Sequence, residues 1–461
     1  MPSAFRTEYD TMGEMQVPAS ALYGAQTQRA VENFPISGLR FNRGFIRALG
    51  LIKAAAAKTN AALGQLPPTL AAAIHTAAEE VADGRYDGQF VIDMFQTGSG
   101  TSTNMNVNEV IARRAGDIVG DGTRIHPNDQ VNLSQSSNDV FPTAIHLAAS
   151  ETVHRNLFPA MEALHQALAG KAEQFWNILK IGRTHLQDAV PMRLGQEFRA
   201  YARQVESNRG RIAAALDGIL ELPLGGTAVG SGLNAPKGFA ASVIKQLAET
   251  TGLRFREARD HFEAQASKDA VAFLSSALKT YALALTKIAN DIRWLASGPR
   301  CGLGEIRLPE VQPGSSIMPG KVNPVIAESL LMVCAQVIGN DTSIAWCCAA
   351  GNFELNTMMP LMAYNLLQSV ELLASGSKNF AERCVAGIEA NQDRLNDLLE
   401  RSLALCTALT PEIGYERAAS LAKKAASTGR TIREIAEADG SIPKDRLAQL
   451  LDPWTMVGGN D

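Results

Sequence analysis

Four short stretches of the sequence are rich in hydroxyl and amide side chains. They are residues 97–108 (TGSGTSTNMNVN), 126–143 (HPNDQVNLSQSSNDVFPT), 182–189 (GRTHLQDA) and 314–324 (GSSIMPGKVNP). We expect each to precede a helix or lie at its start, where unpaired backbone N–H groups and a partial positive charge favour anions. Serine and threonine there are also ordinary N-caps, the better explanation for any one stretch alone. All four together, with Lys321 and His185, favour an anion-binding site.

Such a set of donors suits one kind of chemistry, the removal of a proton from a carbon next to a bound carboxylate. The electrons move into that carboxylate, and donors already aimed at its oxygens stabilise the doubly charged aci-form. Lys321 would supply a full positive charge. The dipoles would come from Ser99, Thr101, Asn138, Thr184 and Asn323.

The same chemistry needs a base and an acid. Histidine titrates near neutral pH, so His185 is suited to protonate a leaving group, and Glu328 could orient its imidazole. A glycine-containing loop could hold Ser315 as an alkoxide that acts as the carbon base. The residues alone leave a second interpretation open, in which Ser315 and Ser316 only cap a turn or bind carboxylate.

The elements that must position these groups are predicted to be helices. From Val271, apolar residues recur in steps of three and four, the pattern of a helix packed against near-parallel neighbours. Residues 261–297 contain no proline or glycine and predict one helix of about 55 Å, ended by Gly298 and Pro299. Further helices are expected at 141–176, with a kink at Pro159, and at 192–222, 325–350 and 358–390.

The pattern predicts an all-α chain in three parts. A mixed, mostly helical domain covers 1–136, a bundle of long helices covers 137–391, and a small helical domain covers 392–461. The glycine-rich residues 223–236 are interpreted as a flexible connector, because they lack the ending of a phosphate-binding loop. The apolar faces of the long helices predict association with copies of the same chain.

The composition excludes several other classes of protein. Of 461 residues, 46% are hydrophobic and 20% charged, and the net charge of −4 comes without a basic block, so nucleic acid is not an expected partner. No secretory signal or uninterrupted apolar run of membrane-spanning length is recognised. Six cysteines without a CxxC pair are interpreted as reduced thiols. Seven histidines without HExxH spacing predict neither a metal site nor a cofactor.

Several motifs resemble one enzyme family in the expected order along the chain. The stretch GSSIMPGKVNP resembles the signature of the fumarase/aspartase superfamily. The stretches YGAQTQRAVENF, TGSGTSTNMNVNEV, HPNDQVN, SQSSNDVFPT and GRTHLQDAVPMRLGQEF resemble class II fumarases. His185 stands where aspartate ammonia-lyases typically have glutamine, Ser137 where they have threonine, and Gly320 where alanine is common.

This resemblance implies a fumarase/aspartase-like fold and a homotetramer whose active sites are each built from three subunits. It implies reversible, metal-independent and cofactor-free hydration of fumarate to (S)-malate, in the tricarboxylic acid cycle and in the cytoplasm. The resemblance implies that Ser315 is the base that takes the proton from carbon. It implies that His185, paired with Glu328, is the acid/base group. The substrate dicarboxylate would meet Ser99, Gly100, Thr101, Ser136, Ser137, Asn138, Thr184, Ser316, Lys321, Val322 and Asn323.

Members of the family also carry a second carboxylate site near the active-site entrance. The residues that match it are His126, Pro127, Asn128 and Asp129. Some relatives have a basic residue three positions before the histidine, where this chain has Thr123, with Arg124 beside it. An ordinary capped turn before a helix explains His126 nearly as well.

Two alternatives to fumarate hydratase are weighed. The first is an aspartate ammonia-lyase, which shares the superfamily's carbanion chemistry. The second is a non-enzymatic structural role on the same helical scaffold. An inactive descendant is expected to have lost one of Ser315, Lys321, Asn323 or His185, and the chain retains all four.

Overall fold

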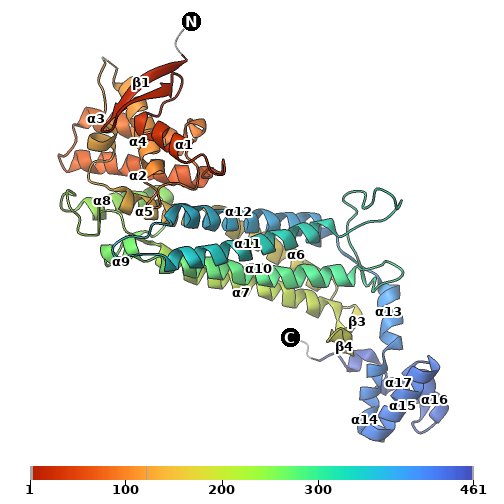
Figure 1. Ribbon diagram of the computed structural model, residues 1–461. Helices are drawn as coiled ribbons and strands as arrows, with labels where there is room; N and C mark the ends of the chain where they lie inside the picture. The colour runs from red at the N-terminus through yellow and green to blue at the C-terminus, as the bar shows by residue number, and fades with distance from the viewer. Residues whose placement is uncertain (1–3, 121, 459–461) are drawn as a thin grey trace. The chain divides into compact units, whose positions relative to one another are not determined.

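The computed structural model describes residues 4–120 and 122–458, most of which are helical (Figure 1). The predicted all-α class is therefore confirmed. The chain divides into two compact units, each made of three segments. The first unit comprises Met1–Pro159, Asn208–Ala282 and Val333–Ser375, and the second comprises Ala160–Ser207, Leu283–Met332 and Gly376–Asp461. The expected three-part division at residues 136 and 391 stays a prediction.

The first unit starts with an antiparallel hairpin and continues as packed helices. Its hairpin is formed by β1 (Phe5–Asp10) and β2 (Gly13–Pro18), which were not predicted from the sequence. Its helices and short strands are α1 (Ala25–Asn33), α2 (Arg43–Ala62), α3 (Pro68–Ala82), α4 (Thr101–Val119), α5 (Ser137–Thr152), β5 (Glu221–Leu222), α8 (Phe239–Thr251), β6 (Arg256–Glu257) and α9 (His261–Ala266). Helix α2 is apolar and buried over most of its surface, and it packs against α3, α5 and α8.

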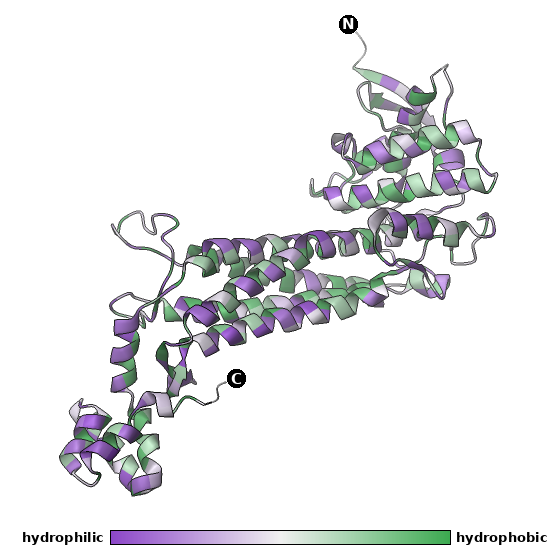
Figure 2. Cartoon of the chain, turned by 180° about the vertical axis from the view of Figure 1, so that it is seen from behind, coloured by the Kyte–Doolittle hydropathy of each residue, from purple (hydrophilic) through white to green (hydrophobic). Residues whose placement is uncertain are grey.

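Five helices contain the boundaries between the two units. They are α6 (Phe158–Gln174), α7 (Leu194–Ile219), α10 (Asp269–Leu295), α11 (Val325–Ala349) and α12 (Met359–Arg383). Both polar and apolar residues occur along these helices (Figure 2). In α7 and α10 the apolar residues gather on one helical face, as expected for helices that bury that face. A π-helical turn, Val153–Leu157, joins α5 to α6, so the predicted helix over 141–176 is continuous except for this turn.

The second unit combines short strands with the C-terminal helices. A hairpin of β3 (Leu179–Thr184) and β4 (Gln187–Arg193) precedes α7, and β7 (Ile306–Arg307) pairs with β8 (Glu389–Ala390). The remaining helices are α13 (Gln392–Arg401), α14 (Thr410–Ile413), α15 (Tyr415–Thr428), α16 (Ile432–Asp439) and α17 (Lys444–Leu450). The helices from α14 to α17 share an apolar core that includes Leu409, Leu421, Ile435 and Leu451, whereas α13 packs Leu399 against Leu179 and Ile181 of β3.

The predicted single helix over residues 261–297 is wrong at one point. It is broken at Ser267 and Lys268, where α9 ends and α10 begins. The ammonium group of buried Lys268 donates to the carbonyl oxygens of Ala264 (3.0 Å), Gln265 (2.7 Å) and Ser267 (2.9 Å). Because this side chain satisfies the carbonyls at the end of α9, the chain can leave the helix without proline or glycine.

Helices α10 and α11 are long and apolar enough to cross a membrane by length and composition alone. Half of the most apolar window of α10, and 39% of that of α11, is buried within the chain. Core helices of a soluble bundle can have the same length and composition. The two helices are therefore weak evidence for a membrane span.

We expect Lys268→Met to lower the free energy of unfolding by about 2–4 kcal/mol, because three carbonyl oxygens, one of them buried and two partly buried, lose their donor. Urea unfolding at fixed protein concentration measures the change. The control is Lys245→Met on α8, whose exposed side chain lies 3.9 Å from Glu249 and should matter by less than about 0.5 kcal/mol. Equal losses in the two variants would contradict the role of Lys268.

The difference in unfolding free energy between the parent and Lys268→Met is expected to depend on pH. Burial lowers the pKa of Lys268 from 10.5 to about 8, so the folded chain releases this proton at a lower pH than the unfolded chain. Between these two values the unfolded state binds more protons, and the parent therefore gains stability relative to Lys268→Met as the pH rises. A difference between the two proteins that stays flat over this range would contradict the assignment.

Candidate functional site

The hydroxyl groups of two helix starts meet in the first unit. Thr101 begins α4 and Ser137 begins α5, and their hydroxyl oxygens share a hydrogen bond of 2.7 Å. The hydroxyl of Ser99 lies 2.8 Å from that of Thr101 and extends the chain of hydroxyls. Each helix start also contributes unpaired N–H groups and a partial positive charge. The prediction that residues 97–108 and 126–143 supply helix starts is confirmed, and the two stretches lie together.

Glycine allows the two helix starts to come this close. Gly100 caps α4 with φ +75°, and a β-carbon there would lie 2.0 Å from a ring carbon of Phe141 on α5. A β-carbon on Gly98 would lie 1.8 Å from the carbonyl oxygen of Thr357, just before α12. A side chain at Gly100 would therefore push the starts of α4 and α5 apart, and one at Gly98 would push the chain before α4 away from Thr357.

The side chain of Asp139 is hydrogen-bonded to the backbone at the start of α5. Its carboxylate is fully buried and accepts hydrogen bonds from the backbone N–H groups of Ser136 (2.9 Å), Gly225 (2.9 Å) and Thr227 (3.0 Å). Burial raises the pKa of Asp139 to about 6, although these three N–H groups act in the opposite direction. The side chain of Asn138, on the next residue, donates to the carbonyl oxygen of Ala228 at 2.8 Å.

The glycine-rich residues 223–236 are therefore not the flexible connector that was expected. Their first part, through Thr227, is buried and held by Asp139 from one side. On the other side, Gln265 donates to the carbonyl oxygen of Thr227 at 2.8 Å, and His261 lies 2.8 Å from that of Pro223. Sequence gave no signal for this, because the partners are 86 and 38 residues away.

A second buried network of hydrogen bonds in the first unit is centred on Lys53 of α2. The ammonium group of Lys53 donates to the side-chain oxygens of Asn132 (2.9 Å) and Gln135 (3.0 Å), and burial lowers its pKa to about 7. The amides of Asn104 and Asn108 also donate to Asn132, at 3.1 and 3.2 Å. Part of the donor-rich stretch 97–108 thus supports the fold. The four-residue spacing of Asn104 and Asn108 puts both on one helical face, and this spacing could have predicted that they share a partner.

The stretch 182–189 is a hairpin turn, so the expectation that it lies at a helix start is wrong. His185 and Leu186 form the two-residue turn between β3 and β4, with φ values of +56° and +58°. Such turns usually carry Asn-Gly, because other residues are strained in this region. The side chains of Thr184 and His185 are exposed, and within the described residues His185 makes no hydrogen bond or ion pair. Strain at an exposed histidine is typical of a functional position.

Two hydrogen bonds join the beginning and the end of the 314–324 loop in the second unit. Gly314 donates its N–H to the carbonyl oxygen of Lys321 at 2.9 Å, and the side chain of Asn323 donates back to the carbonyl oxygen of Gly314. The hydroxyl oxygen of Ser315 accepts the N–H groups of Ile317 (3.3 Å) and Met318 (3.0 Å). The same geometry fits a capped turn and an oxygen that is prepared to carry negative charge.

The remaining predicted residues of the second unit lie apart from these contacts. Ser316, Lys321 and Val322 are exposed, and Glu328 is partly buried in the first turn of α11. Over the part of the chain that the structure describes, no hydrogen bond or ion pair joins His185 to Glu328. The catalytic pairing of these two residues therefore stays a prediction.

The predicted secondary carboxylate site borders a cavity of about 900 Å³ in the first unit. The wall includes His126, Pro127 and Asn128 together with Arg6, Arg113 and Arg124 of the same unit. His126 caps the π-helical turn Pro127–Val131, and its ring nitrogen accepts the N–H of Asp129 at 3.1 Å. The capped turn is present. The wall also carries the carboxylates of Glu8, Asp10, Glu109 and Asp117, so the cavity lining has charges of both signs.

The described part of the chain contains no group of three or more His, Cys, Asp or Glu side chains arranged to hold a metal ion. The predicted catalytic and substrate-binding residues instead carry hydroxyls, amides, one lysine, one histidine and the carboxylate of Glu328. Some of them belong to the first unit and the others to the second.

Comparisons with known proteins identify close relatives over the whole chain. Residues 13–339 match the family described as "Lyase", and residues 405–458 match "Fumarase C C-terminus". The chain is 56% identical to "Fumarate hydratase class II" of Mycobacterium tuberculosis over 445 residues, which cover 96% of this chain and 93% of the relative. It is 52% identical to the protein of the same name from Ralstonia nicotianae over 98% of this chain and 99% of the relative.

A solved structure shows the same fold. The class II fumarase from Schistosoma mansoni superimposes with a TM-score of 0.96 at 40% sequence identity, covering 99% of this chain and 100% of that one.

We expect Gly100→Ala to destabilise the protein more than Gly252→Ala. Both glycines have nearly the same backbone conformation, φ +75° and ψ 14° against φ +72° and ψ 12°, but a β-carbon at Gly252 meets nothing within 4 Å. The strain of a left-handed alanine, about 1–2 kcal/mol, is shared, and the contact with Phe141 adds about 1–3 kcal/mol. Urea unfolding of the two variants measures the difference. Equal losses would mean that the helix starts can move apart freely.

Proposed function

Because the chain belongs to the class II fumarate hydratase family, we propose that it catalyses the reversible, stereospecific hydration of fumarate to (S)-malate. The observation that carries this proposal is the 56% identity to a curated class II fumarate hydratase over 96% of the chain. The chain is thus a hydro-lyase in this proposal, acting in the tricarboxylic acid cycle and located in the cytoplasm.

The substrate carboxylates bind at the paired helix starts. The hydroxyls of Ser99, Thr101 and Ser137 are already joined there, and α4 and α5 direct their positive ends to the same place. Neutral donors can strengthen their hydrogen bonds as negative charge grows on a carboxylate, which lowers the energy of the aci-carboxylate. The proposed substrate-binding residues are Ser99, Gly100, Thr101, Ser136, Ser137, Asn138, Thr184, Ser316, Lys321, Val322 and Asn323.

Ser315 is the proposed carbon base. A serine hydroxyl is a weak base, and its oxygen must be stabilised as an alkoxide before it can accept a proton from carbon. The two backbone N–H groups of Ile317 and Met318 already point at this oxygen. Lys321 in the same loop adds a positive charge, which favours an anionic state of both the base and the substrate.

His185 is the proposed acid/base group at the oxygen of malate, acting through water, with Glu328 as its partner. The strained turn exposes the imidazole without any competing partner in the described chain. A carboxylate at hydrogen-bond distance would fix the tautomer and favour the protonated form. Since no contact joins the two residues within one chain, we propose that Glu328 approaches His185 from another subunit.

A homotetramer with active sites shared by three subunits is part of the proposal. The candidate residues belong to two different units of one chain, and His185 makes no hydrogen bond or ion pair with the residues that the structure describes. Large apolar side chains are also exposed on α10 and α11, among them Phe273, Met332 and Trp346. Helices that expose such residues are usually covered by copies of the same protein.

We propose that the 900 Å³ cavity beside His126 holds the secondary carboxylate site. Arg113 and Arg124 both face Glu8, but at 3.8 and 3.9 Å, so neither cation is tightly neutralised by it. A carboxylate that enters between them would meet His126, Pro127 and Asn128 of the cavity wall. Asp129, the fourth residue of the proposed site, lies 3.2 Å from the ring of His126 and would act through it. Arg124 would then replace the basic residue that some relatives have at the position of Thr123.

The experiment that tests the proposed function follows the ultraviolet absorbance of fumarate. We expect the absorbance to fall when enzyme is added to fumarate in water, because hydration removes the conjugated double bond. Ammonia should not be required and should not change the product. If the absorbance falls only with ammonia present, the chain is an aspartate ammonia-lyase, and if it never falls, the chain is not a hydratase.

Two substitutions separate the two halves of the proposed reaction. Ser315→Ala should nearly abolish exchange of the methylene proton of malate with solvent, because the carbon base is gone. His185→Asn should depress net turnover by about 10²–10⁴-fold while methylene exchange persists relative to hydration, because only the oxygen side loses its acid/base group. Isotope exchange followed by mass spectrometry measures both rates, and size-exclusion chromatography checks that assembly is unchanged. Parent-like methylene exchange in Ser315→Ala would assign the base elsewhere.

A further inference from the structure

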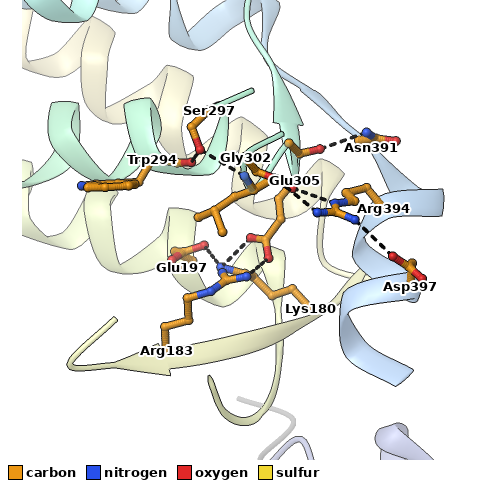
Figure 3. A network of polar contacts seen from close by, with 12 residues as sticks. Lys180, Arg183, Glu197, Trp294, Ser297, Gly302, Glu305, Asn391, Arg394 and Asp397 are labelled. Carbon is orange, nitrogen blue, oxygen red and sulfur yellow. Dashed lines mark hydrogen bonds and ion pairs between the residues drawn. The ribbon is translucent and has the colours of Figure 1, made fainter. Parts of the chain in front are cut away.

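A buried carboxylate connects two segments of the second unit that carry proposed catalytic residues (Figure 3). Glu305 is fully buried, and its carboxylate accepts a hydrogen bond of 2.6 Å from the guanidinium of Arg183. Its other oxygen lies 3.2 Å from the ammonium group of Lys180, which is also buried. Lys180 in turn donates to Glu197 on α7 at 2.7 Å. The cluster thus contains two cations and two anions.

On one side, this cluster holds the strand that leads into the His185 turn. Arg183 and Lys180 both lie on β3, and Arg183 is followed directly by Thr184 and His185. The strand pairing is irregular between Ile181 and Arg183 and resumes with Arg183 opposite Asp188 and Thr184 opposite Gln187, so the ladder fixes the end of β3 to β4 but not to the rest of the unit. The Arg183–Glu305 pair supplies the missing restraint.

On the other side, Glu305 belongs to the segment that leads into the 314–324 loop. Its N–H donates to the carbonyl oxygen of Leu295 at the end of α10, and its own carbonyl oxygen accepts the N–H of Asn391. Ile306, the next residue, pairs with Ala390 in the β7–β8 ladder. The backbone of Glu305 is therefore fixed to three elements of the second unit. Its carboxylate joins this anchored stem to the hairpin.

The stability of the protein does not by itself explain such a cluster. Buried ion pairs recover little more than the cost of removing their charges from water, and apolar residues often stabilise as well. What a buried carboxylate that bridges two cations adds is one defined geometry. The geometry that it defines here is that of the Thr184–His185 turn relative to the stem of the Ser315 loop.

We propose that Glu305 is a positioning residue that fixes the His185 turn and the stem of the 314–324 loop to each other. This inference rests on the proposed function for the roles of His185 and Ser315. Glu305 touches neither substrate nor reacting atoms. It acts through Arg183 on the hairpin and through its own backbone on the loop, so both halves of the reaction depend on it.

The test compares Glu305→Gln with Glu197→Gln. Each variant removes one negative charge that pairs with Lys180, that of Glu305 fully buried and that of Glu197 partly buried, but only the first removes the partner of Arg183. We expect Glu305→Gln to lower kcat by about tenfold or more, with a smaller change in KM. Both isotope exchanges of malate, at the methylene proton and at the hydroxyl oxygen, should fall in parallel. Glu197→Gln should keep both exchange rates within about twofold of the parent.

A double variant separates positioning from the penalty of an unpaired charge. In Arg183→Met/Glu305→Gln, Lys180 and Glu197 remain as a balanced pair, so most of the stability lost in Glu305→Gln should return. Turnover should stay low, because the connection between hairpin and stem is still absent. Recovery of turnover in the double variant would overturn the inference, as would an equal loss of turnover in Glu197→Gln.

Amide hydrogen exchange tests the same connection without an assay of activity. We expect Glu305→Gln to raise exchange in peptides covering 179–190 and 306–323, and Glu197→Gln to leave both segments at the parent level. If the parent fails to hydrate fumarate, the proposed function fails while this measurement still decides whether Glu305 connects the two segments. Unchanged exchange in Glu305→Gln would overturn the connection itself.

Discussion

The buried carboxylate of Asp139 is the contact on which the substrate-facing part of the first unit depends. One carboxylate satisfies the N–H of Ser136 at the start of α5 and two N–H groups of the glycine-rich segment, at Gly225 and Thr227. It therefore fixes the helix start that carries Ser137 and Asn138, and it also fixes the segment to which Asn138 is hydrogen-bonded. These three donors offset part of the cost of burying a charged group here, since an unpaired buried carboxylate would be neutralised or expelled.

The chain uses the same arrangement more than once. Lys53 donates to Asn132 in the first unit, and Lys268 donates to the carbonyl groups between α9 and α10. Glu305 joins β3 to the stem of the 314–324 loop. Each is an almost fully buried charge whose partners are distant in sequence or belong to the backbone. Such groups contribute modest net stability but penalise any other arrangement strongly, because misplacement leaves a charge without a partner. Precise positions for hydroxyls and a histidine are what the proposed chemistry needs.

The two units contribute different parts of that chemistry. The first supplies neutral donors at paired helix starts, which suit a dicarboxylate, and the second supplies the serine, lysine and histidine proposed to move protons. His185 reaches solvent on a strained turn and has no partner among the described residues. This division is the physical reason to propose that several copies of the chain complete each site.

The amino-acid sequence by itself determined the helical class, most of the long helices and the stretches that carry the candidate site. Helix α11 was predicted to within one residue, because apolar periodicity and flanking prolines and glycines are local signals. Only the tertiary structure decided the break at Lys268, the fixed glycine-rich segment, the hairpin at His185 and the partners of Asp139 and Glu305. These depend on hydrogen bonds between residues far apart in the chain, or on one side chain that replaces a local stop signal, and no local pattern records them.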